Sequence, residues 1–180
     1  MLKDAVSKEK LEQIRVLYEA SFPKSEKKPF ELMVEKQKEG LCEFLAIEDE
    51  AGGFCGLAIM ILSAGLALLD YFAIEPNCQG SGLGSTALHE LRERYGSDKV
   101  VVEIERTTGP EARAADNARD RIRRKSFYLR NGMVPTGLLV DLFGVEMEVL
   151  TFGRKLAFAE YYSIYENVLP ERMLDKVRLV

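Results

Sequence analysis

The chain has 180 residues, of which 47% are hydrophobic and 30% charged, so its composition is that of a globular protein with enough apolar surface for a core. Its formal net charge of −4 disfavours nucleic acid as a partner and favours a cationic one. The apolar run from Gly56 to Leu69 is shorter than the ~20 residues that span a bilayer, and the charged N-terminus lacks the apolar core of a signal peptide. We therefore expect no membrane span and a cytoplasmic location.

The cysteine and histidine content argues against disulfides and metal sites. Cys42, Cys55 and Cys78 are odd in number, and their spacing matches neither the disulfide framework of a secreted protein nor a zinc site. We expect all three to be reduced thiols. The single histidine, His89, is expected at the surface, and its solitude argues against a His-based catalytic triad and against His-rich metal sites. We expect no metal cofactor.

The first half of the sequence predicts two helices followed by three strands. Apolar residues fall near helical spacing from Leu11 to Tyr18, after a candidate cap at Ser7. A polar loop, Pro23 to Pro29, separates this helix from a second one that begins near Phe30 and is closed by Gly40. Three apolar segments bounded by turn residues predict strands: Cys42 to Ile47, Phe54 to Leu62 and Leu66 to Ile74.

The second half of the sequence alternates helices with strands. The expected elements are a helix from Leu83 to Tyr95, a strand from Val100 to Glu105, a helical stripe from Ala115 to Leu129 that ends at Asn131-Gly132, two strands from Met133 to Phe143 and from Val145 to Phe152, and a last helix from Lys155 to Leu169. This order predicts an α/β fold with a central mixed, mostly antiparallel sheet and helices on both faces. No linker divides it, so we expect a single domain over residues 1–180.

Glycines gather where the strand that ends at Ile74 turns into a helix. Gly80, Gly82 and Gly84 let the backbone curl without Cβ clashes, so consecutive N–H groups can converge on an anion at the positive end of the helix. Gln79 and Ser81 can add side-chain donors. A plain glycine-rich turn is the alternative. A Walker loop would need a lysine in this turn, and a Rossmann site would follow the first strand, so the pattern favours a diphosphate cradle of another kind.

Two segments resemble the motifs of one enzyme family. The run from Ile74 to Gly84 resembles the pyrophosphate-binding motif of the GNAT acetyltransferases, Gln/Arg-x-x-Gly-x-Gly/Ala, in which Gln79, Gly82 and Gly84 fill the defining positions. The run from Ser126 to Met133 is similar to the family's Phe-Tyr-x-x-x-Gly-Phe segment, with Met133 in place of the usual aromatic residue. The order of elements agrees with a GNAT-like acyl-CoA N-acyltransferase fold over residues 11–152, which leaves 153–180 as a C-terminal helical extension.

The resemblance implies that acetyl-CoA is the cosubstrate, and it predicts which residues bind it. These are the strand residues Phe72, Ala73 and Ile74, whose backbone N–H groups would orient the thioester carbonyl, the turn residues Gln79, Gly80, Ser81, Gly82, Leu83, Gly84 and Ser85, which would hold the diphosphate, and Asn117, which would contact the pantetheine arm. The stretch from Arg106 to Asn117 looks like an inserted loop, so a role for Asn117 as a helix N-cap stays open.

The resemblance also implies catalytic roles. Tyr128 matches the family's tyrosine that protonates the CoA thiolate, and a phenol with an ordinary pKa of ≈ 10 is neutral at pH 7. The alternative is a packed helix aromatic. Glu103 occupies the strand position from which many relatives activate the amine, with Glu105 or ordered water as alternatives. The basic residues between Arg113 and Arg130 are expected mostly to form a solvated helix face.

The sequence thus predicts an N-acetyltransferase that transfers the acetyl group directly to a primary amine of a small molecule or a protein. A catalytically idle CoA-binding module on the same fold is the alternative. The identity of the amine stays open, although the loop from Phe22 to Phe30 is expected to border its site. The amphipathic C-terminal extension is expected to pack on the core or on a second copy of the chain, so a homodimer is also open.

Overall fold

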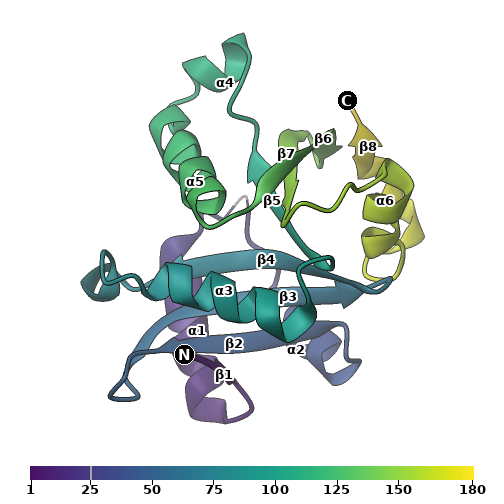
Figure 1. Ribbon diagram of the computed structural model, residues 1–180. Helices are drawn as coiled ribbons and strands as arrows, with labels where there is room; N and C mark the ends of the chain where they lie inside the picture. Colours follow the sequence, from purple (N-terminus) through teal and green to yellow (C-terminus); the bar gives the residue numbers. More distant parts are fainter. Residues whose placement is uncertain (25) are drawn as a thin grey trace. The chain divides into compact units, whose positions relative to one another are not determined.

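The computed structural model describes residues 1–24 and 26–180, and these form two compact units (Figure 1). The first unit comprises residues 1–62 and 69–94, and the second comprises residues 63–68 and 95–180. Ser25, in the loop predicted from Pro23 to Pro29, lies outside the described residues. No helix among the described residues is long and apolar enough to cross a membrane.

The first unit holds all or most of each N-terminal element, and four of these elements are strands. They are β1 (Leu2–Asp4), α1 (Lys8–Ser21), α2 (Phe30–Lys38), β2 (Cys42–Glu48), β3 (Phe54–Ser63), β4 (Leu66–Ile74), the 3-10 helix η1 (Pro76–Cys78) and α3 (Leu83–Tyr95). The strand order is β1-β2-β3-β4, and β2 is antiparallel to both β1 and β3. The predicted helices and strands of this half are confirmed, whereas β1 was not predicted, because three residues with one apolar side chain carry no periodic signal.

Helices cover both faces of this strand layer (Figure 1). The Ser7 side chain accepts a hydrogen bond from the Lys10 N–H and caps α1, as predicted. One apolar cluster joins α1 and α2 to the strands; it includes Ile14, Leu17, Tyr18, Phe30, Met33, Phe44, Leu57, Ile59 and Tyr71. On α3 the buried residues are Ala87, Leu88 and Leu91, while His89 is exposed beside Glu93, as expected. The end of β4 and the turn after it therefore lie beside strands and helices that are packed through buried apolar side chains.

Gly56 on β3 leaves room for the end of β4. A Cβ added at Gly56 would lie 2.5 Å from the Ala73 carbonyl oxygen and 3.0 Å from Ile74 Cδ1. Because a backbone oxygen cannot swing away like a side chain, we expect Gly56→Ala to lower the free energy of unfolding by about 1–3 kcal/mol. Urea unfolding followed by circular dichroism measures this change, and an unchanged midpoint would contradict the close approach.

The second unit holds the C-terminal elements. They are β5 (Val100–Glu105), α4 (Pro110–Ala114), α5 (Ala118–Arg130), β6 (Val134–Leu142), β7 (Val145–Thr151), α6 (Phe158–Glu166), the 3-10 helix η2 (Glu171–Lys176) and β8 (Val177–Leu179). The strand order is β5-β7-β6-β8, and all three neighbouring pairs are antiparallel. The α/β class, with a mixed sheet and helices, is confirmed.

Three expectations for this half are corrected. The stretch from Arg106 to Asn117 is not all loop, because Pro110 starts the short helix α4. The last helix ends at Glu166 rather than at Leu169, and η2 and β8 follow it. On α5 the predicted apolar stripe is not buried throughout, since Ile122 is 55% exposed and Leu129 is 41% exposed. The aromatic residues of α6 do pack inward, and Tyr161 and Tyr165 are buried.

Candidate functional site

The glycine turn lies where the sequence predicts it, between the end of β4 and the start of α3. Gly80 and Gly82 adopt φ values of +80° and +87°, a region that residues with a Cβ rarely occupy. No described atom lies within 4 Å of a Cβ added at either glycine, so the space beside this backbone is open. Leu83 and Gly84 form the first turn of α3, where N–H groups have no acceptor within the helix. The geometry fits a bound anion.

The side chains of Gln79 and Ser81 were expected to donate hydrogen bonds to the anion, but they donate to backbone carbonyls of the turn instead. Gln79 Nε2 donates a hydrogen bond of 3.0 Å to the Ile74 carbonyl, and Ser81 Oγ donates one of 2.6 Å to the Cys78 carbonyl. The Gly82 carbonyl accepts bonds from the Ser85 and Thr86 amides, which fixes the start of α3. The bracing leaves backbone amides, rather than these two side chains, as the donors that an anion would meet in the described turn.

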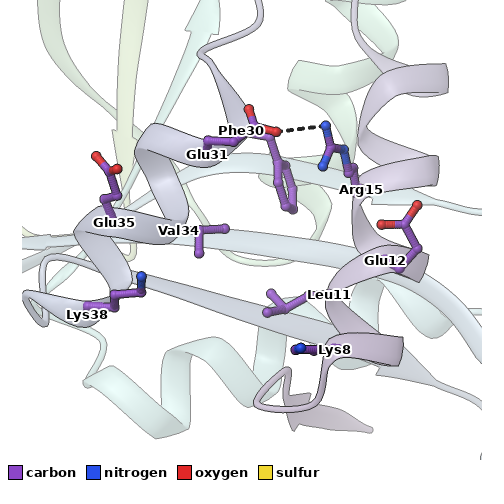
Figure 2. Close-up of a pocket in the computed structure, with 9 residues that line it drawn as sticks. All are labelled: Lys8, Leu11, Glu12, Arg15, Phe30, Glu31, Val34, Glu35 and Lys38. Carbon is purple, nitrogen blue, oxygen red and sulfur yellow. Dashed lines mark ion pairs between the residues drawn. The ribbon is translucent and has the colours of Figure 1, made fainter.

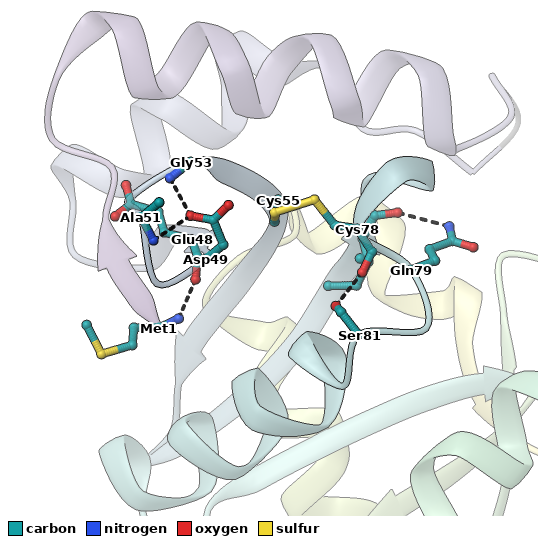
Figure 3. Close-up of a disulfide and its surroundings, with 10 residues drawn as sticks. Met1, Glu48, Asp49, Ala51, Gly53, Cys55, Cys78, Gln79 and Ser81 are labelled. Atoms are coloured by element: carbon teal, nitrogen blue, oxygen red, sulfur yellow. Dashed lines mark hydrogen bonds between the residues drawn. A yellow bond between two sulfur atoms is a disulfide. The ribbon is translucent and has the colours of Figure 1, made fainter.

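A disulfide joins β3 to the residue just before this turn (Figure 3). Cys55 and Cys78 are bonded, with their Cα atoms 5.7 Å apart, a separation that suits a disulfide. The expectation of three reduced thiols is therefore wrong for these two and right for Cys42, which is free and buried. Counting cysteines misses the pair because their proximity depends on the fold: the Glu75 amide donates to the Cys55 carbonyl, and Cys78 follows three residues later.

We expect the protein purified in air to show one free thiol when denatured without reductant, and three after reduction. In the native state that thiol should react slowly at pH 8, because burial raises the pKa of Cys42 to about 12. Cys55→Ala should lower the free energy of unfolding by about 3 kcal/mol, because the unfolded chain is then no longer constrained by the loop that the disulfide closes between Cys55 and Cys78. Three reactive thiols in the unreduced, denatured protein would contradict the pairing.

Tyr128 is a buried residue of α5 that is 6% exposed. Burial raises the pKa of its phenol to about 12, although the nearby Arg124 guanidinium lowers it. The hydroxyl is therefore protonated throughout the ordinary pH range. The Phe127 ring lies 5.2 Å from the Tyr128 ring, and Asn131-Gly132 ends the helix there, as the sequence predicts. The residue has the protonation state that a general acid needs, and its catalytic role stays a prediction.

The two candidate bases on β5 have different surroundings. Glu103 is half-buried, and its carboxylate accepts a 2.6 Å hydrogen bond from the Tyr165 hydroxyl on α6. Glu105 is buried and pairs with two arginines of α5, Arg121 at 2.7 Å and Arg124 at 3.3 Å. A carboxylate whose two oxygens are each held by a guanidinium group is not available to contact an incoming amine. Of the two, Glu103 is the better candidate.

Asn117 is the N-cap residue of α5 by position, but its side chain makes no capping hydrogen bond. Its amide nitrogen lies 3.2 Å from both carboxylate oxygens of Glu105, and its amide oxygen accepts a bond from Arg121 Nε. Asn117 thus orients the pair of Glu105 and Arg121. Contact with the pantetheine arm stays a prediction.

Several basic side chains of α5 do not belong to a solvated helix face, which corrects the expectation for these residues. Arg121 and Arg124 pair with Glu105, and Lys125 pairs with Glu148 on β7. Others match the expectation, since Arg123 pairs with Asp120 on the exposed side of the helix. Three residues of the basic run, Arg121, Arg124 and Lys125, therefore hold α5 against the strands of its own unit.

Glu103→Gln is expected to lower kcat/KM for a primary amine, because a base that accepts the proton and a carboxylate that attracts the cation are lost together. The loss should shrink as the pH rises, since the amine then deprotonates without help. Glu105→Gln is the matched control: it should cost unfolding free energy more than activity, because it breaks the pairs with Arg121 and Arg124. Equal kcat/KM for Glu103→Gln and the parent across the pH range would exclude Glu103.

Sequence reasoning did not predict a groove between α1 and α2 (Figure 2). Its volume is about 460 Å³. The lining consists of apolar Leu11, Phe30 and Val34 with basic Lys8, Arg15 and Lys38 and acidic Glu12, Glu31 and Glu35. Arg15 and Glu31 pair across it at 2.7 Å. The three basic and three acidic side chains give the lining no net charge.

Solved structures reveal what the chain resembles, whereas no protein-family model and no curated protein sequence matches it. A protein assigned to the GNAT acetyltransferases from Bacteroides thetaiotaomicron superposes with a TM-score of 0.70 at 18% identity, covering 96% of this chain and 98% of its own. The chain has the fold of the GNAT acetyltransferases.

Two further GNAT-fold structures are similar to the chain. Spermidine N-acetyltransferase from Vibrio cholerae, solved with CoA and spermine, matches with a TM-score of 0.60 at 14% identity, over 84% of this chain and 93% of its own. An aminoglycoside 6'-N-acetyltransferase, solved with coenzyme A, matches with a TM-score of 0.64 at 13% identity, over 87% and 99%. At these identities the likeness establishes the fold.

Proposed function

We propose that the chain is an acetyl-CoA-dependent N-acetyltransferase that transfers the acetyl group directly to a primary amine. The observation that carries the proposal is the turn at Gly80 and Gly82, whose left-handed backbone opens onto free space at the N-terminus of α3. Converging amides and the positive end of a helix favour a diphosphate. The similar structures support it, since two of them are acetyltransferases solved with CoA and named for amine substrates.

The residues of the chain are assigned separate tasks. Within the turn from Gln79 to Ser85, the amides from Gly80 to Gly84 hold the diphosphate, and amides of Phe72, Ala73 and Ile74 orient the thioester carbonyl. Acetyl-CoA, when bound, supplies the thioester whose carbonyl carbon the amine attacks as the carbon–sulfur bond breaks. Glu103, directly or through water, accepts the proton that the amine loses. Tyr128 gives its proton to the thiolate, and Asn117 contacts the pantetheine arm.

Cys78 is not the acyl acceptor in this scheme. It precedes the diphosphate cradle, and its sulfur is bonded to Cys55. A covalent acyl-cysteine route would need a free thiolate. The disulfide therefore supports direct transfer over an acyl-Cys78 route.

The test measures two quantities on one preparation. Calorimetry with CoA measures cofactor binding, and thiol release during incubation with acetyl-CoA and a panel of primary amines measures turnover. We expect both. Binding without turnover of any amine would favour the idle CoA-binding module, and the absence of binding would remove the proposal. We also propose a cytoplasmic location and a single domain over residues 1–180, with the C-terminal extension packed on the core or on a second copy of the chain.

A further inference from the structure

A largely buried carboxylate of the first unit already holds an ammonium group. Asp70 lies on β4, and only 10% of its side chain is exposed. Lys28, in the loop between α1 and α2, places its ammonium 2.7 Å from each oxygen of that carboxylate. The sequence does not indicate this pair, because Lys28 and Asp70 are 42 residues apart and meet only in the fold. Burying a carboxylate is costly unless a cation pairs with it or the protein uses it.

An aromatic ring also faces the Lys28 ammonium. The Lys28 nitrogen lies 5.7 Å from the centre of the Tyr71 ring. Tyr71 packs edge-on against Tyr18 at 4.8 Å and against Phe22 at 4.9 Å, so the ring is fixed in place. A carboxylate beside an aromatic face is the combination that recognises alkylammonium groups.

The backbone of the loop does not depend on the Lys28 side chain. The Tyr18 hydroxyl donates to the Lys28 carbonyl at 2.9 Å, and the Tyr71 hydroxyl donates to the Glu26 carbonyl at 2.8 Å. The Lys28 amide donates to the Tyr71 oxygen at 3.1 Å. Burial raises the pKa of both phenols, so the hydroxyls stay protonated and keep donating. These bonds hold the backbone at Glu26 and Lys28 without the Lys28 ammonium, whose side chain is 35% exposed.

We propose that Asp70 and Tyr71 form a binding site for a second ammonium group of the acceptor, and that Lys28 fills this site until the acceptor displaces it. The inference rests on the proposed function. Asp70 precedes Phe72 by two residues on β4, about 6.6 Å along an extended strand. A charged amine bound at Asp70 and a neutral amine reacting near Phe72 would therefore be joined by a short alkyl spacer. The acceptor class is a diamine or polyamine, or another compound with two amines at this spacing.

The first experiment measures binding of putrescine, a diamine, and butylamine, its monoamine counterpart, by calorimetry without acetyl-CoA. We expect the parent to prefer putrescine. Asp70→Asn should weaken putrescine binding about tenfold or more and remove the preference, because the charge partner is lost. Lys28→Met should strengthen putrescine binding by up to about fivefold. This factor corresponds to the free energy of a partly exposed ion pair, because the Lys28 ammonium no longer competes with putrescine for Asp70.

Two further variants keep the test decisive. Lys28→Arg preserves the ion pair and should weaken putrescine binding, since a bidentate guanidinium is harder to displace. Lys27→Met is the matched control, because Lys27 pairs with Glu19 instead and its loss should change nothing. A purely structural ion pair would make Lys28→Met and Asp70→Asn weaken binding alike, and that result would overturn the inference. So would an absence of putrescine binding in the parent and in Lys28→Met. The binding measurement needs no acetyl transfer. A chain without acetyltransferase activity could therefore still bind putrescine at Asp70, and an active chain could fail to bind it there.

Discussion

Tyr128→Phe is expected to lower kcat by about 10²-fold or more while CoA binds as tightly as before, since general acids contribute about 10²–10⁴-fold. Only the hydroxyl is removed, and the ring still fills the buried space against Phe127. A loss in kcat without a change in CoA affinity would place the hydroxyl in the chemical step. Single-turnover kinetics measure the rate of the chemical step, and calorimetry measures the affinity for CoA.

The pH dependence adds a second measurement. Burial raises the pKa of Tyr128 to about 12, so ionisation of this phenol should not reduce the parental rate below about pH 11. In the unfolded chain the phenol ionises near its ordinary pKa of ≈ 10, so its contribution to stability is complete below pH 10 and is lost between pH 10 and 12. Tyr162→Phe, on the half-buried side of α6, is the matched control and should leave kcat unchanged. An undiminished rate in Tyr128→Phe, with chemistry limiting, would leave Tyr128 as a packed aromatic.

The elements that sequence predicted well are those with their own local signal. The strand from Leu66 to Ile74 is bounded by Gly65 and Pro76, and its limits agree with β4. The cap at Ser7 and the end of α5 at Asn131-Gly132 follow from residue chemistry alone. Such features depend on neighbours in the chain, which a sequence displays directly.

The elements and contacts that sequence missed depend on partners far away in the chain. β8 is three residues long and exists because Val177 and Leu179 pair with β6. Cys55 meets Cys78 across 23 residues, and Lys28 meets Asp70 across 42. Glu103 and Glu105 share one face of a strand, so alternation could not separate them; Tyr165 and the two arginines of α5 do.

Gly82→Val is expected to remove detectable CoA binding. In the φ region of +87° a β-branched residue is strained, so the backbone must shift, and its side chain would also fill the open space beside the turn. Each charge-assisted hydrogen bond lost from an anion costs about 1.5–3 kcal/mol, so losing two would weaken binding by more than ~10²-fold. Calorimetry with CoA measures the change.

Gly52→Val separates this effect from a loss of folding. Gly52 also has a positive φ, +82°, and no described atom lies within 4 Å of an added Cβ, but it sits in the turn between β2 and β3. Both variants should therefore lose similar unfolding free energy, about 1–2 kcal/mol, from the strain of a left-handed residue. Only Gly82→Val should lose CoA. If both folded variants bound CoA like the parent, the turn would be a plain glycine-rich connection, and the Leu83 and Gly84 amides at the start of α3 would hold no diphosphate.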